Sequence, residues 1–383
     1  MFNVIMLGIT SLLTDISSEM VYPLIAVYLT TLGATPAIIG LIEGLAESTA
    51  SLLKVFSGYF SDKIKKRKPF TIFGYSFSGL GKLLLYLSTS WHLVLLARIS
   101  DRFGKGVRTA PRDALIAESS SKTKKGKAFG LHRTMDSAGA VAGVLLAYFF
   151  MTVWHGSYKT VFLWSLVPAV LGVAFLFFVK ESRKKDAKKI KKISAKLKIS
   201  FKDFKRLNIK LRYFLMIAFL FTLGNSSNQF LFLRSKNIGF SAATIILLYL
   251  AYNIVYTFAS YPAGIISDKI GRKKILVAGY LFYGIVYLGF ALASAKFTVW
   301  VLFALYGLYS GLTDGIEKAF VSDVAPPEQK ATMMGLHATI IGIGLFPASF
   351  VAGILWTQIG PAAPFIMGGI TGILSAVLLL FLI

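Results

Sequence analysis

The chain alternates between mostly apolar blocks and short polar connections. Each block contains roughly 20 residues, and a helix of that length crosses about 30 Å of hydrocarbon at about 1.5 Å per residue. Lipid cannot hydrogen-bond a free backbone N–H, so these segments must be helical. The pattern predicts twelve spanning helices, at residues 3–30, 36–60, 70–88, 92–114, 128–152, 160–179, 212–233, 242–266, 275–293, 297–318, 334–356 and 361–383.

The composition agrees with this pattern. Hydrophobic residues make up 55% of the 383 residues and charged residues 15%, whereas charged residues approach about a quarter of a soluble domain. The chain has no cysteine, which excludes a disulfide framework, a thiolate zinc site and a thiol nucleophile. We therefore predict an all-α membrane protein that needs no cofactor.

Basic residues are concentrated in alternate connections. The net charge of +25 would suggest nucleic acid in a soluble protein, but here the lysines and arginines cluster at 63–68, 122–127, 180–212 and 269–274. By the positive-inside rule, these loops and both termini are cytoplasmic, in a multi-pass protein of the cell membrane. The first apolar stretch contains Asp15 and Glu19 and lacks a basic start, so we interpret it as a spanning helix rather than a cleavable signal.

The second half of the chain repeats the first. Gly58-Tyr-Phe-Ser-Asp-Lys-Ile recurs as Gly264-Ile-Ile-Ser-Asp-Lys-Ile, and Gly130-Leu-His132 recurs as Gly335-Leu-His337. Conserved spacing of charged loop residues is not expected from chance similarity between apolar helices. We predict two pseudo-symmetric six-helix bundles, at 1–180 and 212–383. The basic linker 181–211 between them is either an amphipathic helix on the anionic inner leaflet or a linker without regular structure.

Three motifs resemble those of the major facilitator superfamily. They are the repeated Gly-x-x-x-Asp loop, the fourth-span segment Arg102-Phe-Gly-Lys-Gly-Val-Arg-Thr-Ala110, and Gly139-x-x-x-Gly143 in the fifth span. The resemblance covers essentially the whole chain and points to the multidrug/proton antiporter branch. It implies a monomer that works by alternating access, with a proton-transfer role for Arg102. It also implies cytoplasmic gating loops, at Gly58, Asp62, Lys66, Arg112, Gly264, Asp268 and Arg272.

Charged residues also occur inside the predicted spans. A charge at the bilayer centre costs about 3 kcal/mol on insertion scales, so such residues normally face a cavity or pair with one another. Asp15 and Glu19 are four residues apart on the first helix, and Glu43 and Glu47 on the second, so each pair shares a helix face. The first half therefore contains an acid–base network, from which we assign proton coupling to Asp15, Glu19, Arg102 and Asp136.

In the second half, amides stand where the first half has carboxylates. Ser17-Ser18-Glu19 is matched by Ser226-Ser227-Asn228, and Glu47 by Asn253. We therefore expect the second half to shape the substrate site and the first half to carry protons. The residues assigned to the substrate cavity are Glu43, Glu47, Arg98, Asn225, Asn228, Gln229, Tyr252, Asn253 and Asp314.

These features predict a secondary transporter for a small solute, with proton-coupled export of a small organic compound as the leading hypothesis. The cations of the fourth span favour an organic anion instead, and the four first-half carboxylates allow a divalent metal ion as cargo. We predict no resident metal site. No Ser/His/Asp grouping, His-Glu-x-x-His or Walker loop favours an enzyme, and the internal duplication favours a carrier over a channel. The sequence leaves the substrate, its charge and the direction of coupling open.

Overall fold

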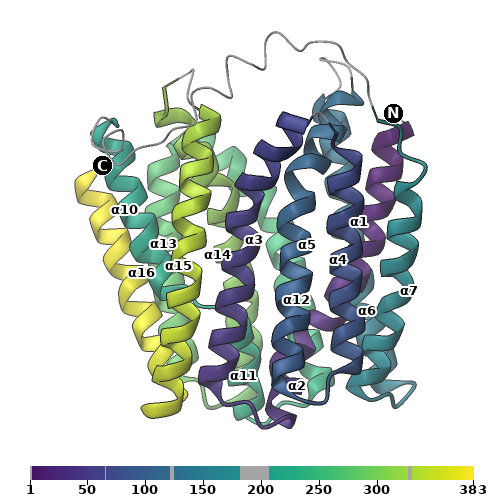
Figure 1. Cartoon of the computed structure of the whole chain (residues 1–383). Coiled ribbons are helices and arrows are strands. Elements are labelled where there is room, and N and C mark those ends of the chain that lie inside the picture. The colour runs from purple at the N-terminus through teal and green to yellow at the C-terminus, as the bar shows by residue number, and fades with distance from the viewer. Residues whose placement is uncertain (1, 65, 121–124, 182–206, 327–329) are drawn as a thin grey trace. The chain divides into compact units, whose positions relative to one another are not determined.

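The computed structural model describes residues 2–64, 66–120, 125–181, 207–326 and 330–383, which contain helices and no strands. Most of the predicted linker, 182–206, lies outside these residues, and so does the side chain of Asp62. Figure 1 shows the helices running side by side within each part of the chain.

All twelve predicted spans correspond to helices (Figure 1). In the first half these are α1 (Phe2–Val21) with the short 3-10 turn η1 (Tyr22–Leu24) and α2 (Ile25–Thr31), α3 (Pro36–Ile64), α4 (Lys68–Leu87), α5 (Trp91–Glu118), α6 (Lys125–Thr152) and α7 (Tyr158–Leu176). In the second half they are α10 (Ile209–Gly224) with α11 (Gln229–Asn237), α12 (Ala242–Ile270), α13 (Arg272–Leu292), α14 (Lys296–Val324), α15 (Lys330–Gln358) and α16 (Ala363–Leu382).

Among the described residues, nine segments are long and apolar enough to cross a membrane by length and composition. The other three predicted spans are also helical. They are α3 and α5, whose interiors contain charged residues, and the pair α10 and α11, which is interrupted between Gly224 and Gln229. The all-helical membrane fold predicted from the sequence is therefore confirmed.

The first span of each half is interrupted, although the two interruptions do not fall at matched positions of the repeat. The first is interrupted by η1, where Pro23 cannot supply a backbone N–H, and the seventh is interrupted at residues 225–228. Non-helical backbone at membrane depth is tolerated where protein or water satisfies its polar groups, and broken helices of this kind often line transport sites. Both breaks therefore mark positions where polar groups face the interior of the protein.

Contacts divide the chain into two compact units with equivalent packing. In unit 1, which holds most of the first half, α1 packs on α6 and α7, and α4 packs on α5 and α7. In unit 2, α10 packs on α15 and α16, and α13 packs on α14 and α16. Two short segments belong to the unit of the other half: Thr35–Gly44 to unit 2 and Ser241–Leu250 to unit 1. The four matching helix pairs give the sequence repeat its structural basis.

Glycines allow close helix contacts inside unit 1. A Cβ atom on Gly143 of α6 would lie 2.5 Å from the carbonyl oxygen of Ile16 in α1, and a Cβ on Gly139 would lie 2.9 Å from the Cα of Leu12. Gly-x-x-x-Gly spacing is typical of close helix packing, and Gly139 and Gly143 pack against α1 in this way. By contrast, a Cβ on Gly264 would meet nothing within 4 Å, so close helix packing is not the reason for glycine at that position.

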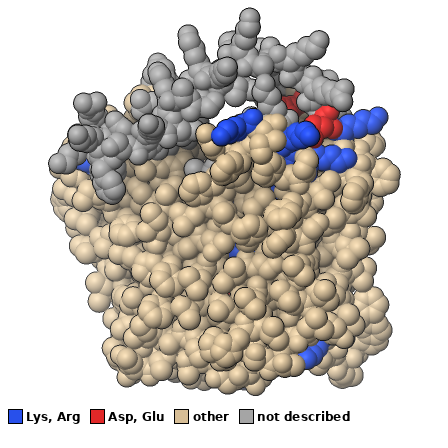
Figure 2. All heavy atoms as spheres, viewed as in Figure 1, with Lys and Arg blue, Asp and Glu red and all other residues tan. Residues whose placement is uncertain are grey.

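Large apolar side chains cover much of the outer surface. Phe258 and Tyr261 of α12 are each 77% exposed, and Leu292 is 83% exposed. In the view of Figure 2 the surface is mostly uncharged, with lysines and arginines gathered mainly at one end. Such a surface is unfavourable in water and favourable in lipid.

Each chain terminus lies beside a basic connection within its own unit. Asn3 hydrogen-bonds to Lys180 through both its side-chain nitrogen and its side-chain oxygen. Lys273, in the basic connection 269–274, donates to the backbone oxygen of Leu380 over 2.9 Å. Each terminus therefore shares a membrane side with the basic loops of its unit.

Candidate functional site

A buried ion pair joins α4 to α5 in unit 1. The Lys82 ammonium contacts the Asp101 carboxylate, with Lys82 2% and Asp101 8% exposed, and Lys82 also donates to the Ser18 hydroxyl over 3.0 Å. Arg98, one turn earlier on α5, lies 3.7 Å from the second carboxylate oxygen of Asp101. Lys82 has no role among the residues assigned from the sequence, although a lysine inside an apolar span was a signal that could have found it.

Glu47 links α3 to the same face of α5. Its carboxylate lies 3.1 Å from the Arg102 guanidinium and 3.9 Å from that of Arg98. Both guanidiniums also lie 5.8 Å from the ring centroid of Tyr22, within cation–π range. Glu47 and Arg98, which we assigned to the substrate cavity, therefore contact Arg102, which we assigned to proton coupling, and Tyr22 of η1 lies beside both arginines.

Asp15 and Asp136 form a second acidic feature of unit 1. Their carboxyl groups are close neighbours across the α1–α6 contact, so the charge of each one affects the other. Arg133 lies 3.2 Å from Asp136 on the same helix. Asp136 precedes Gly139 by one helical turn, so the close approach of α1 and α6 at the glycines brings these two carboxyls together.

Glu19 lies one turn beyond Asp15 on α1 and accepts a hydrogen bond of 2.8 Å from the hydroxyl of Tyr249. Tyr249 belongs to the α12 segment that packs in unit 1, and its ring lies 5.5 Å from that of Tyr22. Three of the four residues predicted to couple protons, Asp15, Glu19 and Asp136, thus lie on the packed helices α1 and α6. Arg102 neighbours Glu19 electrostatically but forms its direct ion pair with Glu47.

In unit 2 the predicted amides contact tyrosines of α14. Asn225, at the helix break, donates to the Tyr309 hydroxyl over 3.3 Å, and the Asn228 side-chain oxygen accepts from the Tyr306 hydroxyl over 2.8 Å. Tyr252 of α12 donates to Ser310 over 3.3 Å and stacks on Tyr306 at 5.4 Å between centroids. The structure therefore brings Asn225, Asn228 and Tyr252 into one aromatic and polar cluster.

Further tyrosines of α13 complete this cluster and were not found from the sequence. The ring of Tyr283 lies 4.1 Å from Tyr287 and 4.8 Å from Tyr309, and Tyr287 lies 6.0 Å from Tyr306. Both α13 tyrosines are fully buried. Aromatic residues are common throughout this chain, so composition did not distinguish these from tyrosines that face lipid.

The remaining predicted cavity residues are more dispersed. Glu43 is fully buried in unit 2 and accepts from the Ser227 hydroxyl over 3.3 Å. Gln229 is also fully buried, at the first position of α11. Asn253 is half-buried on α12, whereas Asp314 on α14 is exposed. Glu317, also on α14, accepts from Tyr280 over 2.9 Å and lies 3.6 Å from His337.

The residues assigned to the gating loops form cross-links at the helix ends. In unit 2, Arg272 lies 3.3 Å from Asp268 and 2.6 Å from Asp323, and so ties α12 to α14. Gly271 precedes it with a φ of +97°, a backbone conformation that favours glycine at this turn.

The equivalent bridge of unit 1 is made by a different residue from the one assigned. Arg67 lies 2.7 Å from Glu118, the counterpart of Asp323, whereas Lys66 is exposed. Glu118 and Asp323 occupy matching positions in the two halves, which could have indicated this bridge from the sequence. Its basic partner was missed because Arg67 stands one residue after Lys66, the position that matches Arg272.

The other two assigned loop residues of unit 1 contact the neighbouring helices. A Cβ atom on Gly58 of α3 would lie 3.3 Å from the Cβ of Ala110 in α5, so the two helices are close at this point. Arg112 of α5 pairs with Asp113 at 2.9 Å and donates to the Ser11 hydroxyl of α1 over 3.1 Å. Both residues therefore hold α5 against its neighbours.

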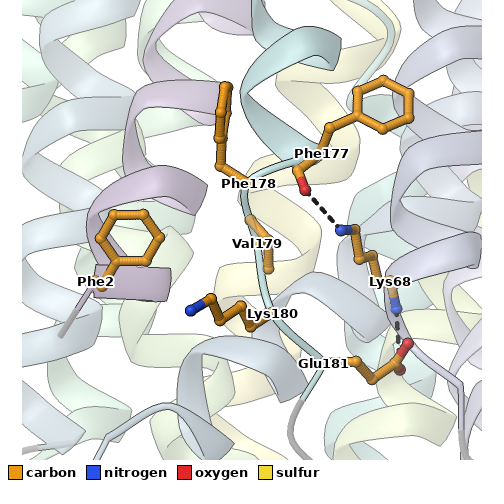
Figure 3. Close-up of a pocket in the computed structure, with 7 residues that line it drawn as sticks. All are labelled: Phe2, Lys68, Phe177, Phe178, Val179, Lys180 and Glu181. Atoms are coloured by element: carbon orange, nitrogen blue, oxygen red, sulfur yellow. Dashed lines mark hydrogen bonds between the residues drawn. The ribbon is translucent and has the colours of Figure 1, made fainter.

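A hollow of about 690 Å³ lies away from this chemistry. Figure 3 shows its lining at the ends of α1, α4 and α7, with Phe2, Phe177 and Phe178 beside Lys68, Lys180 and Glu181. Lys68 donates to the Phe177 carbonyl over 2.9 Å. Exposed phenylalanines beside lysines at helix ends are typical of a surface at the lipid headgroups, not of a substrate path.

Within the described ranges, no three His, Cys, Asp or Glu side chains converge on a point where a metal ion could bind. The four carboxylates considered as metal ligands have separate partners. Glu47 contacts arginines, Glu43 a serine, Glu19 a tyrosine and Asp15 a second aspartate. The geometry gives a metal cargo no support.

A duplicated set of membrane-spanning helices, with two broken spans and charged groups held at membrane depth, defines a polytopic membrane transporter. The chain belongs to the Major Facilitator Superfamily, whose family model matches residues 7–234 and 214–383.

Known proteins support this assignment. The chain is 42% identical to the uncharacterized MFS-type transporter MJ1317 of Methanocaldococcus jannaschii, over 99% of this chain and 94% of that protein. Its fold is similar to that of a mutant of the nucleoside transporter NupG, with a TM-score of 0.81 and 15% identity over 99% of this chain and 98% of the other. It is also similar to a D-xylose–proton symporter, with a TM-score of 0.77 and 15% identity over 100% and 98%.

Proposed function

We propose that this transporter couples the export of a small organic compound to the entry of protons. The observation that carries the proposal is the neighbouring pair Asp15 and Asp136 at the close contact of α1 with α6, because two adjacent carboxyls that repel each other when both are ionised form a site that can bind and release one proton. Glu19, one turn away, extends the acidic path along α1, and Arg102 adds a cation that can exchange carboxylate partners.

The proposed cycle uses alternating access. Protonation of the pair from outside neutralises one charge, and a change in the surroundings of the carboxyls on rearrangement releases the proton to the cytoplasm. In this scheme the amide and tyrosine cluster of unit 2 holds the solute. The carboxyl pair of unit 1 then senses the proton gradient.

The test is proton flux in proteoliposomes that contain a pH-sensitive dye, driven by an imposed pH gradient. Three solutes serve as probes: salicylate, tetraphenylphosphonium and adenosine. Solute transport by Asp15→Asn and by Asp136→Asn should become independent of the gradient, a loss of at least tenfold in gradient-driven rate. Proton movement opposite to the solute supports antiport, and movement with it contradicts antiport.

Glu317→Gln is the matched control, because Glu317 is a buried carboxylate of unit 2 with hydrogen-bonding partners of its own. It should retain the dependence on the pH gradient. If Glu317→Gln abolishes coupling and both aspartate variants retain it, the proton site lies in the second half and the proposal is wrong.

We further propose that the transporter acts as a monomer in the cell membrane, with both termini and the basic loops in the cytoplasm. The charge asymmetry of the connections supports this orientation. The basic linker 181–211 would then face the anionic inner leaflet between domains 1–180 and 212–383. The gating role proposed for the loops is supported by the matching bridges Arg67–Glu118 and Arg272–Asp323.

A further inference from the structure

Lys105 differs from the other cations of α5. Its side chain is exposed, whereas Arg98, Arg102 and Arg108 on the same stretch of helix are 3%, 8% and 4% exposed. Those three have side-chain partners: Arg98 and Arg102 contact carboxylates, and Arg108 donates to the Ser78 hydroxyl over 2.6 Å. Within the described part of the chain, the Lys105 ammonium has no carboxylate within 4 Å and no hydrogen-bond acceptor.

The depth of Lys105 excludes a position at the membrane surface. It is close to the middle of α5, with 14 residues from Trp91 and 13 residues to Glu118. At about 1.5 Å per residue, this helix is longer than the roughly 30 Å hydrocarbon core, so a residue near its middle lies about 15 Å from each edge of the core. A lysine side chain extends well short of this, so snorkelling does not bring its charge to the headgroups.

The direction of the side chain excludes lipid. The charged neighbours of Lys105 are Arg102, Glu47, Asp15 and Arg108, so it faces the ionisable network of α1, α3 and α5. An exposed ammonium at this depth must therefore line a space that water enters. A water-exposed cation with no carboxylate partner inside a membrane carrier is available to a ligand of opposite charge.

We propose that Lys105 binds the anionic group of the transported solute, a carboxylate or a phosphate, so that the substrate is an organic anion. This inference rests on the proposed transport function and narrows its substrate class. The Lys105 ammonium supplies up to three N–H donors to the anion, and the nearby positive charges of Arg102 and Arg108 strengthen the attraction.

The chain contains no cysteine, so a single reporter thiol can measure the local charge without a known substrate. Thr109 lies one turn from Lys105, and its hydroxyl bonds the Lys105 backbone oxygen over 2.6 Å. The reporter variant Thr109→Cys is reconstituted and treated with an anionic sulfonate and with a cationic trimethylammonium methanethiosulfonate. The rate at which each reagent modifies the reporter is divided by the rate at which the same reagent modifies a free thiol in solution, so that the ratio reports the local charge and not the intrinsic reactivity of the reagent.

The reporter should react with both reagents and prefer the anionic one. Adding Lys105→Gln should reduce that preference about tenfold, since a cleft of one charge sign concentrates counter-ions by roughly that factor or more. Lys105→Arg should keep it. Val170→Cys on α7, whose side chain is 64% exposed on an apolar helix, is the control for a lipid-facing position and should not react.

Two results would overturn the assignment: a Thr109 reporter that reacts with neither reagent, or a preference that Lys105→Gln leaves unchanged. Neither measurement depends on proton flux. If either of these labelling results is found while proton coupling is intact, the anion site alone is refuted. If labelling behaves as expected but proton coupling does not depend on Asp15 and Asp136, the proton site alone is refuted.

Discussion

Single charged residues inside the helices determine much of the chemistry that this transporter can perform. Lys82 and Asp101 are almost sealed from solvent, and each satisfies the other's charge across the α4–α5 contact. A buried ion pair of this kind adds little to the stability of the fold compared with apolar residues of similar size. The loss of one partner is costly because it leaves a charge in a medium that cannot solvate it.

Lys82→Met should therefore lower the free energy of unfolding by about 3–5 kcal/mol, and the double variant Lys82→Met with Asp101→Leu should recover more than half of that loss. Thermal unfolding of the purified protein in detergent measures both changes. Lys66→Met, at an exposed lysine, should stay within about 0.5 kcal/mol of the parent. If the loss of unfolding free energy in the double variant equals the sum of the losses in the two single variants, the two residues do not act as a pair.

At the scale of helices, the contact of α1 with α6 positions the proposed proton site. The glycines at 139 and 143 let the two backbones approach, and Asp136 then reaches Asp15 from the adjacent turn. In unit 2, a helix interruption positions the polar side chains. The break after Gly224 brings Asn225 and Asn228 to the tyrosines of α14.

Gly143→Ala tests this helix contact, because the added Cβ would lie 2.5 Å from the Ile16 carbonyl oxygen and 3.0 Å from its Cα. Overpacking of this kind costs about 1–3 kcal/mol, and the displaced helix should also weaken gradient-driven transport. Gly130→Ala on the same helix meets nothing within 4 Å and should be neutral or stabilising by about 0.5–1 kcal/mol. Thermal unfolding and proteoliposome flux measure the two effects. If Gly143→Ala and Gly130→Ala had the same stability and the same transport rate, Gly143 would not be needed for the close contact of α1 with α6.

At the scale of the whole molecule, lipid is the solvent that makes the fold possible. The exposed phenylalanines and leucines require a hydrocarbon environment, and the charged connections require water. The number of spans between two loops decides whether those loops face the same compartment.

Three spans, α4, α5 and α6, separate Lys66 from His155. Single-cysteine variants Lys66→Cys and His155→Cys should therefore react from opposite sides with a membrane-impermeant maleimide. In right-side-out vesicles only His155→Cys should be labelled, and in inverted vesicles only Lys66→Cys, because the basic loop stays in the cytoplasm. Labelling of both from one side would contradict the helix count of the first half, and the reversed pattern would contradict the orientation.

The twelve helices, their duplication and the family could be predicted from the sequence because each depends on local patterns. Lipid sets the length and polarity of a span, and a repeat remains visible when Ser-Asp-Lys-Ile recurs at the same place in both halves. Gly139-x-x-x-Gly143 likewise predicted a close contact from the glycine spacing within one helix. Glu47, Arg98 and Arg102 could be grouped because their charges needed partners in lipid.

The identity of the partners required the tertiary structure, because it depends on how each helix is rotated and which neighbour it meets. Lys82 pairs with Asp101, Asp15 meets Asp136, and Arg67 rather than Lys66 bridges to Glu118. The exposed position of Lys105 beside buried arginines also follows from packing alone. The sequence by itself thus determined that charges are buried in a membrane carrier, and only the packed helices decided which charges neutralise each other and which one stays exposed.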